Sequence, residues 1–335
     1  MKSIKLYLSQ IIITVILIEV TFRLFGYQPY QVQKYSLRST PEQCILPDEK
    51  LGFQLNDGTF QVIINDSVKY SVKHADNQRI TSYQQHSDTA QVWLFGGSFP
   101  YGMGIDDSLA YPFLTQQNFP YFKIKSHCVP GFGMVQSLLQ IPTLLKKDSI
   151  KPKKIILHYA SFYEDRNLLT PAYRVALHHG FMNSSEEARS FYKKAHYPFI
   201  NVTRTGFKIK LERLDQLYQN WWGRNYSSTI NFLQTFEDSF GITDEEKSKG
   251  SERIIQKLRT FCHRNNIELI IATITNDLAT DEVKEYCKRY EIELVDLFVD
   301  FSDPNFSNLP HDSHPNAKAH QVYADKMKAF LNKNK

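Results

Sequence analysis

Ser98 follows a short apolar run and two glycines in the segment VWLFGGSFPYGMG, residues 92–104. Two glycines in succession let the backbone turn sharply and leave space beside the next side chain. Chemistry in α/β proteins is expected outside the carboxyl ends of the strands, and this hydroxyl lies at such an end. Ser98 is a nucleophile if a base reaches it and a turn residue if none does. The segment is not the G-x-S-x-G elbow, because Pro100 replaces the last glycine.

A base, and a carboxylate to orient it, stand near the other end of the chain in LPHDSHPNAKAHQVYADKMKAFL, residues 309–331. Pro315 is placed to be the first residue of the last helix, and it disfavours the helical conformation for His314. Asp312 is close enough to accept a hydrogen bond from one imidazole nitrogen, which leaves the other nitrogen to take the proton of Ser98. The same pattern also fits Asp312 as a helix cap and His314 as a surface residue.

Other titratable groups near this loop are expected to take no part in proton transfer. His311 is expected to be a solvated loop residue, although its position also allows contact with a substrate. His320 lies inside the last helix, where we expect it to pack or cap. Asp300 and Asp303 are interpreted as solvated carboxylates. The loop then offers one base and one carboxylate.

Strands alternate with helices from Gln91 onward, which predicts a mostly parallel, doubly wound sheet. The expected strands are Val92–Phe95, Phe122–Val129, Lys154–Ala160, Glu268–Thr273 and Glu293–Leu297. The expected helices are Ala110–Asn118, Met134–Lys147, Ser251–Asn265, Thr280–Tyr290 and Pro315–Leu331. Ser98 is therefore expected at the carboxyl end of the first of these strands.

Two segments stand outside this alternation. Residues 28–90 carry short alternating runs broken by Asn-Asp-Gly and Asn-Asp, which predict a small β-rich lead-in. Residues 168–250 are rich in aromatic and charged side chains, and we expect a mainly helical insertion within a domain of residues 91–335. Trp221 and Trp222 in this insertion are either packing residues or a platform on which a sugar ring stacks.

Residues 1–27 are interpreted as a membrane anchor. Lys2 and Lys5 precede the apolar stretch Leu6–Phe25, which approaches the roughly 20 residues that a membrane span needs. No small-residue cleavage site follows it, which favours a retained signal-anchor over a removed signal peptide. A soluble helix would need a polar face that this stretch lacks. The lysines place the N-terminus in the cytoplasm and the rest of the chain outside it, periplasmic or extracellular, and Glu19 and Arg23 are spaced to pair on one helix face.

Composition argues against several other functions. The chain has 335 residues and a formal net charge of +5, but its basic residues form no run of five or six, which argues against nucleic-acid binding. The cysteines lie far apart without a C-x-x-C spacing, so we expect no metal site, although an exported domain permits one or two disulfides. These cysteines are Cys44, Cys128, Cys262 and Cys287.

Several segments resemble the SGNH/GDSL hydrolase superfamily. LFGGSFPYGMGIDDSLAYPFLTQQ, residues 94–117, is similar to its first block in the branch with Gly-Gly-Ser. HDSHPNAKAH, residues 311–320, is similar to the last block, and VPGFGMVQSLLQI, residues 129–141, to the second. The N-terminal anchor with LPDEKLGFQLNDG, residues 46–58, resembles the lead-in of membrane-anchored members.

This resemblance implies a flavodoxin-like α/β fold and a catalytic triad. Ser98 would be the nucleophile, His314 the general base and acid, and Asp312 the orienting carboxylate. The backbone N–H groups of Ser98 and Gly133 would bind the oxyanion, with Gly131 as the alternative second-block glycine.

The chain departs from the family pattern in three blocks. Gly97 stands where the first block has aspartate, and Phe99 where it has leucine. The third block normally supplies an asparagine at a strand end, whereas HYASFYEDRN has Glu-Asp there, and Asn167 is the candidate third donor. The last block is often D-x-x-H, but here the aspartate comes two residues before the histidine.

The resemblance covers residues 91–167 and 250–331 well and the insertion poorly. It implies a serine esterase that uses no cofactor and no metal. The expected substrate is an ester, O-acyl groups included, on a glycan or lipid of the cell envelope or the extracellular space. Two alternatives stay open: an envelope O-acyltransferase with the same triad, and a non-catalytic glycan-binding relative.

Overall fold

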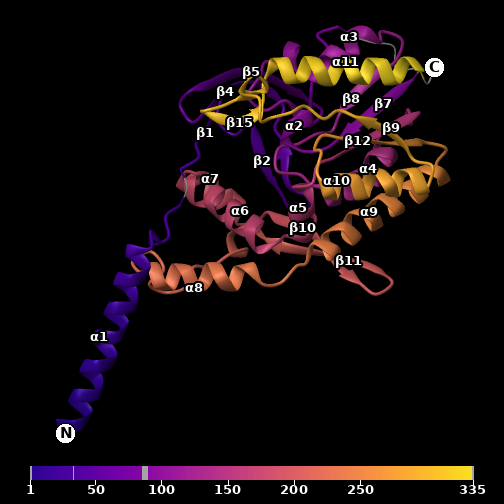
Figure 1. The fold of residues 1–335 in the computed structure, drawn as a ribbon. Coiled ribbons are helices and arrows are strands. Elements are labelled where there is room, and N and C mark those ends of the chain that lie inside the picture. Colours follow the sequence, from indigo (N-terminus) through magenta and orange to yellow (C-terminus); the bar gives the residue numbers. More distant parts are fainter. Residues whose placement is uncertain (1, 33, 85–89, 334–335) are drawn as a thin grey trace.

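A nine-stranded sheet runs through the globular part of the chain in the order β1-β4-β5-β6-β8-β7-β9-β12-β13 (Figure 1). The computed structural model describes residues 2–32, 34–84 and 90–333. The parallel half of the sheet consists of β7 (Gln91–Phe95), β8 (Lys123–Ser126), β9 (Lys154–Tyr159), β12 (Glu268–Thr273) and β13 (Glu293–Asp296). In chain order this half reads 2-1-3-4-5, the flavodoxin-like arrangement. The predicted fold class is confirmed.

The parallel strands are covered on both faces, which is why their sequences are continuous apolar runs. Every residue of β7 is buried, and Trp93 at its centre has no exposed surface. Figure 1 shows helices above and below the sheet, and the contacts between elements agree. The two groups are α3 (Tyr111–Asn118) with α11 (Ala317–Lys333), and α4 (Met134–Lys147) with α9 (Asp244–Arg264) and α10 (Leu278–Arg289).

The lead-in extends the sheet on its antiparallel side. Its strands in the sheet are β1 (Leu37–Thr40), β4 (Gly58–Ile64), β5 (Val68–Ala75) and β6 (Gln78–Arg79). Arg79 of β6 pairs with Ser126 of β8 and joins the two halves. A separate hairpin is formed by β2 (Ile45–Asp48) and β3 (Gly52–Leu55). The lead-in therefore shares one sheet with the parallel strands.

The segment between β9 and β12 contains the expected helices and one hairpin that is not predicted. Its helices are α5 (Tyr163–Leu168), α6 (Pro171–Asn183), α7 (Glu186–Tyr192) and α8 (Ser228–Ser239). The hairpin consists of β10 (His196–Thr203) and β11 (Gly206–Arg213). Helix α9 begins at Asp244, earlier than the predicted Ser251, because Thr243 and Glu246 form a capping box there.

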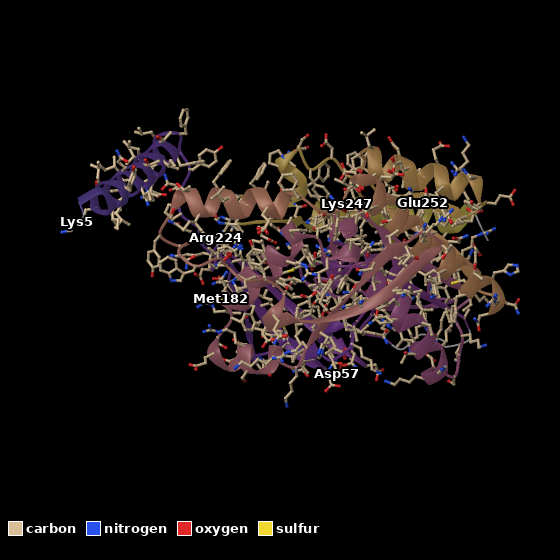
Figure 2. All side chains as sticks on the ribbon, turned by 90° about the horizontal axis from the view of Figure 1, so that it is seen from below. Lys5, Asp57, Met182, Arg224, Lys247 and Glu252 are labelled. Carbon is tan, nitrogen blue, oxygen red and sulfur yellow. The ribbon has the colours of Figure 1, made fainter. Side chains whose placement is uncertain are left out.

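Helix α1 (Lys2–Leu24) projects away from the globular part (Figure 1). Residues Ile4–Leu24 are long and apolar enough to cross a membrane, a property that signal sequences share. Figure 2 shows Lys5 near the free end of this helix. Glu19 and Arg23 pair, as their spacing predicts, with Oε1 and Nε 2.7 Å apart.

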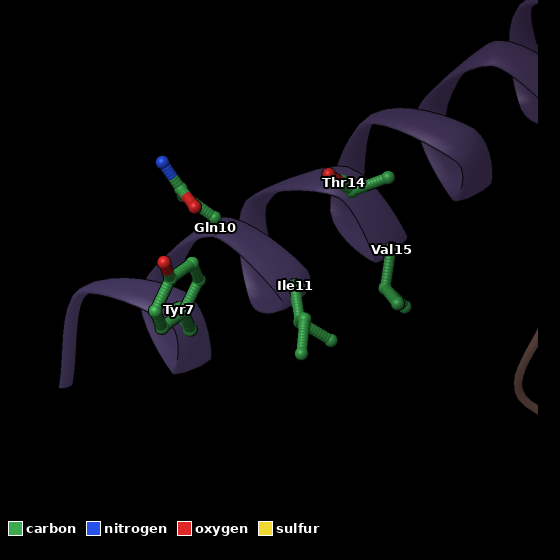
Figure 3. A pocket seen from close by; sticks show the side chains of 5 residues that line it. All are labelled: Tyr7, Gln10, Ile11, Thr14 and Val15. Atoms are coloured by element: carbon green, nitrogen blue, oxygen red, sulfur yellow. The ribbon is translucent and has the colours of Figure 1, made fainter. Parts of the chain in front are cut away.

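Apolar side chains of α1 are exposed along its length. Tyr7, Ile11 and Val15 project from the helix (Figure 3), and their exposed fractions are 65%, 60% and 60%. Such a surface is typical of a helix that is covered by lipid, or by nothing, rather than by its own domain.

The four cysteines are free and buried. Burial raises the pKa of three of these thiols to about 12, so they stay protonated and unreactive. These three are Cys128, Cys262 and Cys287.

Candidate active site

The parallel half of the sheet has its topological switch point between β7 and β9, because β8 is added on one side of β7 and β9 on the other. Doubly wound sheets bind ligands outside the carboxyl ends of the strands at such a point. Ser98 comes three residues after the end of β7, as the first residue of α2 (Ser98–Tyr101). Asn167 lies on α5, which follows β9. The topology therefore brings two of the predicted site residues to the edge where a ligand is expected.

Ser98 is held by a single helical turn. Gly102 ends α2 in the left-handed conformation, with φ +86°. The N–H groups of Gly102 and Met103 donate to the Ser98 carbonyl oxygen at 3.0 and 3.1 Å. Ser98 is 4% exposed, and in the described part of the chain neither its Oγ nor its N–H makes a hydrogen bond. Both groups are therefore free to meet a substrate.

Gly97, just before the serine, has no room for a side chain. A Cβ there would lie 2.8 Å from Arg166 Nη1 and 2.9 Å from both the Phe132 carbonyl oxygen and the Tyr163 hydroxyl. The Gly97 N–H donates to the Tyr163 hydroxyl at 2.7 Å, and Arg166 donates to the Phe132 carbonyl at 2.8 Å. Tyr163 and Arg166 thus occupy the space that a side chain at position 97 would need, and neither residue was predicted to have a role at the site.

The loop that follows α2 is fixed by a buried arginine of the lead-in. Arg79 pairs with the carboxylate of Asp107, with Nε and Oδ1 2.8 Å apart. It also donates to the carbonyl oxygens of Tyr101, Gly102 and Ile105 at 2.9, 2.5 and 2.7 Å. The lead-in therefore positions the serine turn, a role that no signal in the local sequence indicated.

Asp312 and His314 lie on strand β15 (Asp312–Pro315), which pairs with β14 (Ser307–Asn308). Nδ1 of His314 is 2.9 Å from both Oδ1 and Oδ2 of Asp312. The Asp312 side chain is 2% exposed and the imidazole 16% exposed. A carboxylate that accepts from Nδ1–H fixes the tautomer in which Nε2 carries the lone pair.

The prediction that Pro315 begins the last helix is wrong. Pro315 pairs with Ser307 as the last residue of β15, so strand pairing keeps it extended, and α11 begins at Ala317. The Asn316 side chain caps this helix, accepting N–H groups of its first turn at 3.0 and 3.3 Å. His314 precedes the helix as expected, but a strand pair holds it there.

Helix α2, which begins with Ser98, packs against β15, which carries Asp312 and His314. The rings of Phe99 and His314 meet edge to face, with centroids 5.6 Å apart. A Cβ on Gly104 would lie 3.4 Å from Oδ2 of Asp312. Phe99, next to Ser98, thus contacts His314, and Gly104 of the following loop lies close to Asp312. No hydrogen bond joins Ser98 Oγ to the imidazole among the described residues. Catalytic hydrogen bonds are often long before a substrate binds.

Gly133 and Asn167 lie side by side. A Cβ on Gly133 would be 2.7 Å from Asn167 Oδ1, and this oxygen accepts the N–H of Met134 at 2.8 Å. Nδ2 of the fully buried Asn167 has no partner among the described residues. The Gly133 N–H donates to Oε1 of Gln136 at 2.9 Å. Asn167 therefore offers an unused donor, whereas the Gly133 donor is engaged.

Gly131, the alternative second-block glycine, shapes the preceding turn. It adopts the left-handed conformation with φ +84°. Its carbonyl oxygen accepts the hydroxyls of Tyr173 and Tyr197 at 2.9 and 3.0 Å. Two tyrosines of the insertion therefore hold this turn in place.

Two buried histidines near the site belong to the scaffold. His320 accepts the Tyr111 N–H on its Nδ1 at 3.1 Å, and Nδ1 of His158 is 2.7 Å from the Phe95 carbonyl oxygen. Burial lowers the pKa of His320 to about 3 and that of His158 to about 4, so both are neutral near pH 7. His311 is exposed. The described residues contain no group of three or more His, Cys, Asp or Glu arranged to hold a metal ion.

No protein-family model and no curated protein matches the sequence. Among solved structures, the chain is similar to a lipolytic protein of the G-D-S-L family from Veillonella parvula, with 11% identity, a TM-score of 0.41, and coverage of 72% of this chain and 98% of that one. It is also similar to a psychrotrophic esterase from Pseudoalteromonas, with 10% identity, a TM-score of 0.40, and 72% and 97% coverage. A family two carbohydrate esterase from Clostridium thermocellum, in complex with cellohexaose, matches with 10% identity, a TM-score of 0.38, and 77% and 67% coverage.

Proposed function

We propose that the protein is a serine esterase of the SGNH/GDSL type. The observation that carries this proposal is the pair formed by the buried Asp312 carboxylate and His314, packed beside the turn of Ser98 at the switch point of the sheet. A serine, an imidazole and an orienting carboxylate are the groups that acyl transfer needs, and they are recognised by geometry rather than by their order in the chain.

The proposed reaction begins with attack of Ser98 Oγ on the ester carbonyl carbon while His314 Nε2 takes the hydroxyl proton. The oxygen of the tetrahedral intermediate accepts hydrogen bonds from the Ser98 N–H and Asn167 Nδ2, both of which lack partners among the described residues. The C–O bond to the alcohol then breaks, and the alcohol leaves with the proton from His314. Water attacks the acyl-enzyme by the same route, which releases the acid and restores Ser98.

Gly133 contributes to this oxyanion hole only if its N–H exchanges Gln136 Oε1 for the substrate oxygen. Each preorganised donor is worth about 3–4 kcal/mol of transition-state stabilisation. The proposed hole therefore relies first on Ser98 and Asn167.

We further propose that α1 is retained as an anchor and that the domain acts outside the cytoplasm on O-acyl groups of an envelope glycan or lipid. Glu19 supports retention, because its carboxylate accepts the N–H groups of Ser228 and Thr229 at 2.9 and 3.0 Å and the Ser227 hydroxyl at 2.7 Å. Removal of a signal peptide that contains Glu19 would leave these donors at the start of α8 without the carboxylate. Lys2 and Lys5 before the apolar stretch support the orientation.

The test is Ser98→Ala in the full chain, assayed with short-chain aryl esters and with a fluorophosphonate probe. We expect both ester cleavage and covalent labelling to disappear while circular dichroism is unchanged. Ser313→Ala, which changes an exposed serine beside the proposed base, is the matched control and should keep both activities. Labelling or robust turnover by Ser98→Ala would refute the assignment of the nucleophile. If the unchanged protein transfers the acyl group to an added glycan in place of water, the nucleophile stands and only the acceptor differs.

A further inference from the structure

Helix α8 exposes an apolar face that no described element covers. Leu233 and Phe236 lie on α8, Phe240 is the extended residue that follows its last turn, and the three side chains are 46%, 53% and 61% exposed. The rings of Phe236 and Phe240 are in contact, with centroids 4.6 Å apart. Gln234, on the opposite side, is buried and accepts the N–H of Trp221 at 2.8 Å. We call Leu233, Phe236 and Phe240 the α8 apolar face.

The start of α8 is joined to the end of α1. The Glu19 carboxylate caps the first turn of α8 through Ser228 and Thr229, as described above, and a carboxylate is favoured at a helix N-terminus. Arg23 Nη2 donates to the Tyr226 carbonyl oxygen at 2.9 Å. Figure 2 shows the same junction, with Arg224 close to the start of α8.

Aromatic rings continue this junction onto the apolar face. The Phe232 ring lies 4.7 Å from the Phe22 ring and 5.0 Å from the Tyr27 ring, measured between centroids. It also stacks with Phe236 at 6.2 Å. The apolar surface of α1 and the α8 apolar face are therefore one continuous surface.

The depth of the junction follows from the length of α1. The segment Ile4–Leu24 has 21 residues, which at about 1.5 Å per residue matches a hydrocarbon core of about 30 Å. Glu19 comes five residues before Leu24, so it lies within about 8 Å of the end of the span. A helix whose first turn is bonded to Glu19 therefore begins within about 8 Å of the boundary between the acyl chains and the headgroups.

We propose that α8 lies in the membrane interface, with the α8 apolar face in the boundary between headgroups and acyl chains. The occupant of this face is the lipid bilayer, because the face is continuous with the proposed membrane span and starts within about 8 Å of the end of that span. Figure 1 places α8 on the side of the globular part from which α1 leaves. Tyr226 and Trp222, in the segment before α8, are 83% and 94% exposed, and these residue types concentrate at membrane interfaces.

This inference rests on the proposed anchor, and it adds the orientation of the domain relative to the membrane. A domain held by one helix alone can tilt about the end of that helix. Attachment through both α1 and α8 fixes the tilt of the sheet relative to the bilayer, so the edge with Ser98 is presented at a constant height and angle.

The experiment places one nitroxide spin label on the full-length protein in phosphatidylcholine vesicles. Because the native cysteines are buried, a label reacts selectively with an introduced surface cysteine. The probe variants are Phe236→Cys and Phe240→Cys, and the control is Leu109→Cys, which is 41% exposed and lies two residues before α3. Figure 1 shows α3 on the opposite side of the globular part from α8. Collision rates with oxygen, which concentrates in lipid, and with a water-soluble nickel chelate give the depth of each label.

We expect the labels at positions 236 and 240 to collide more with oxygen than with the chelate, and the label at 109 to show the reverse. If the protein floats with the vesicles in a density gradient but the label at 236 collides more with the chelate than with oxygen, as at 109, the inference is overturned and the anchor stands. Protein that does not float would refute the anchor and the inference together. Spectral broadening caused by labels at 236 lying close together, and lost when unlabelled protein is added, would show that a second copy of the chain covers this face. That result would also overturn the proposal.

Discussion

Asn167 accepts the Met134 N–H on its amide oxygen at 2.8 Å, and this single bond leaves its buried Nδ2 without a partner among the described residues. The oxygen is thereby fixed as the acceptor side of the amide, so the nitrogen is the side presented as a donor. A buried polar atom without a partner costs about 1–3 kcal/mol. Such a cost is expected where the missing partner is a substrate or intermediate that is bound only during reaction.

Asn167→Asp is therefore expected to lower kcat by about 10²–10³ while KM changes little. Aspartate keeps an oxygen for Met134 but replaces the donor with a second acceptor, which repels the developing oxyanion. Steady-state kinetics and circular dichroism measure the effect. Asn266→Asp, the same change at an exposed turn, should be neutral. Full activity of Asn167→Asp would remove this residue from the oxyanion hole.

The orienting carboxylate is tested by Asp312→Asn. We expect a folded protein whose kcat falls by up to about 10⁴, because an amide facing His314 Nδ1 can stabilise the wrong tautomer. Asp300→Asn changes an exposed carboxylate whose Oδ1 accepts the Ser302 N–H, and it should retain nearly full activity. His311→Ala should also stay active. Loss of activity in His311→Ala together with an active His314→Ala would show that the base has been assigned to the wrong histidine.

Gly97 provides a test of packing behind the serine. Gly97→Ala should destabilise the protein by about 1–3 kcal/mol and reduce turnover, because the new Cβ must displace Arg166 or the Tyr163 hydroxyl next to Ser98. Gly206→Ala, whose Cβ would have no heavy atom within 4 Å, is the control. Thermal unfolding and kcat are the readouts. Unchanged values for both variants would mean that the space behind Ser98 is not constrained as described.

The parallel sheet was predictable because buried strands leave a local signal, a short apolar run closed by polar or glycine residues. The strand–helix alternation then sufficed for the doubly wound fold, and the Asp-x-His spacing for a hydrogen bond between Asp312 and His314. Pro315 shows the limit of local reasoning. A proline in this position suits the start of a helix, but here Pro315 pairs with Ser307 and belongs to a strand. The partners of Arg79 and Gly97 come from segments that are distant in the chain, and the residues around Arg79 and Gly97 in a single sequence do not predict these contacts.

The missed hairpin β10–β11 has a different cause. GFKIKLER alternates apolar and polar residues, whereas HYPFINVT begins with a continuous apolar run, and the prediction of a mainly helical insertion rests on the high content of aromatic and charged residues in the whole segment. Glu19 is a third case, because a carboxylate in a membrane span predicts a nearby cation and does not reveal that it caps a helix more than 200 residues later.

His127→Phe tests how buried histidines shape the stability of the fold. His127 is buried, its ring stacks on Phe95 with centroids 5.0 Å apart, and burial lowers its pKa to about 3. In the unfolded chain a histidine has a pKa near 6.5, so between these two values the unfolded state binds a proton that the native state does not. The contribution of this group to stability is therefore complete above about pH 6.5 and is lost as pH falls toward 3.

Phenylalanine keeps the stacking and removes the titration. The free energy of unfolding of His127→Phe, measured by urea denaturation in detergent, should fall less between pH 7 and pH 5 than that of the unchanged protein, by up to about 1.4 kcal/mol per pH unit. His263→Phe, the same substitution at an exposed position on α9, is the control for the change of side chain. Equal slopes for His127→Phe and the unchanged protein would show that His127 titrates alike in the folded and unfolded chains, and so is not held neutral by burial.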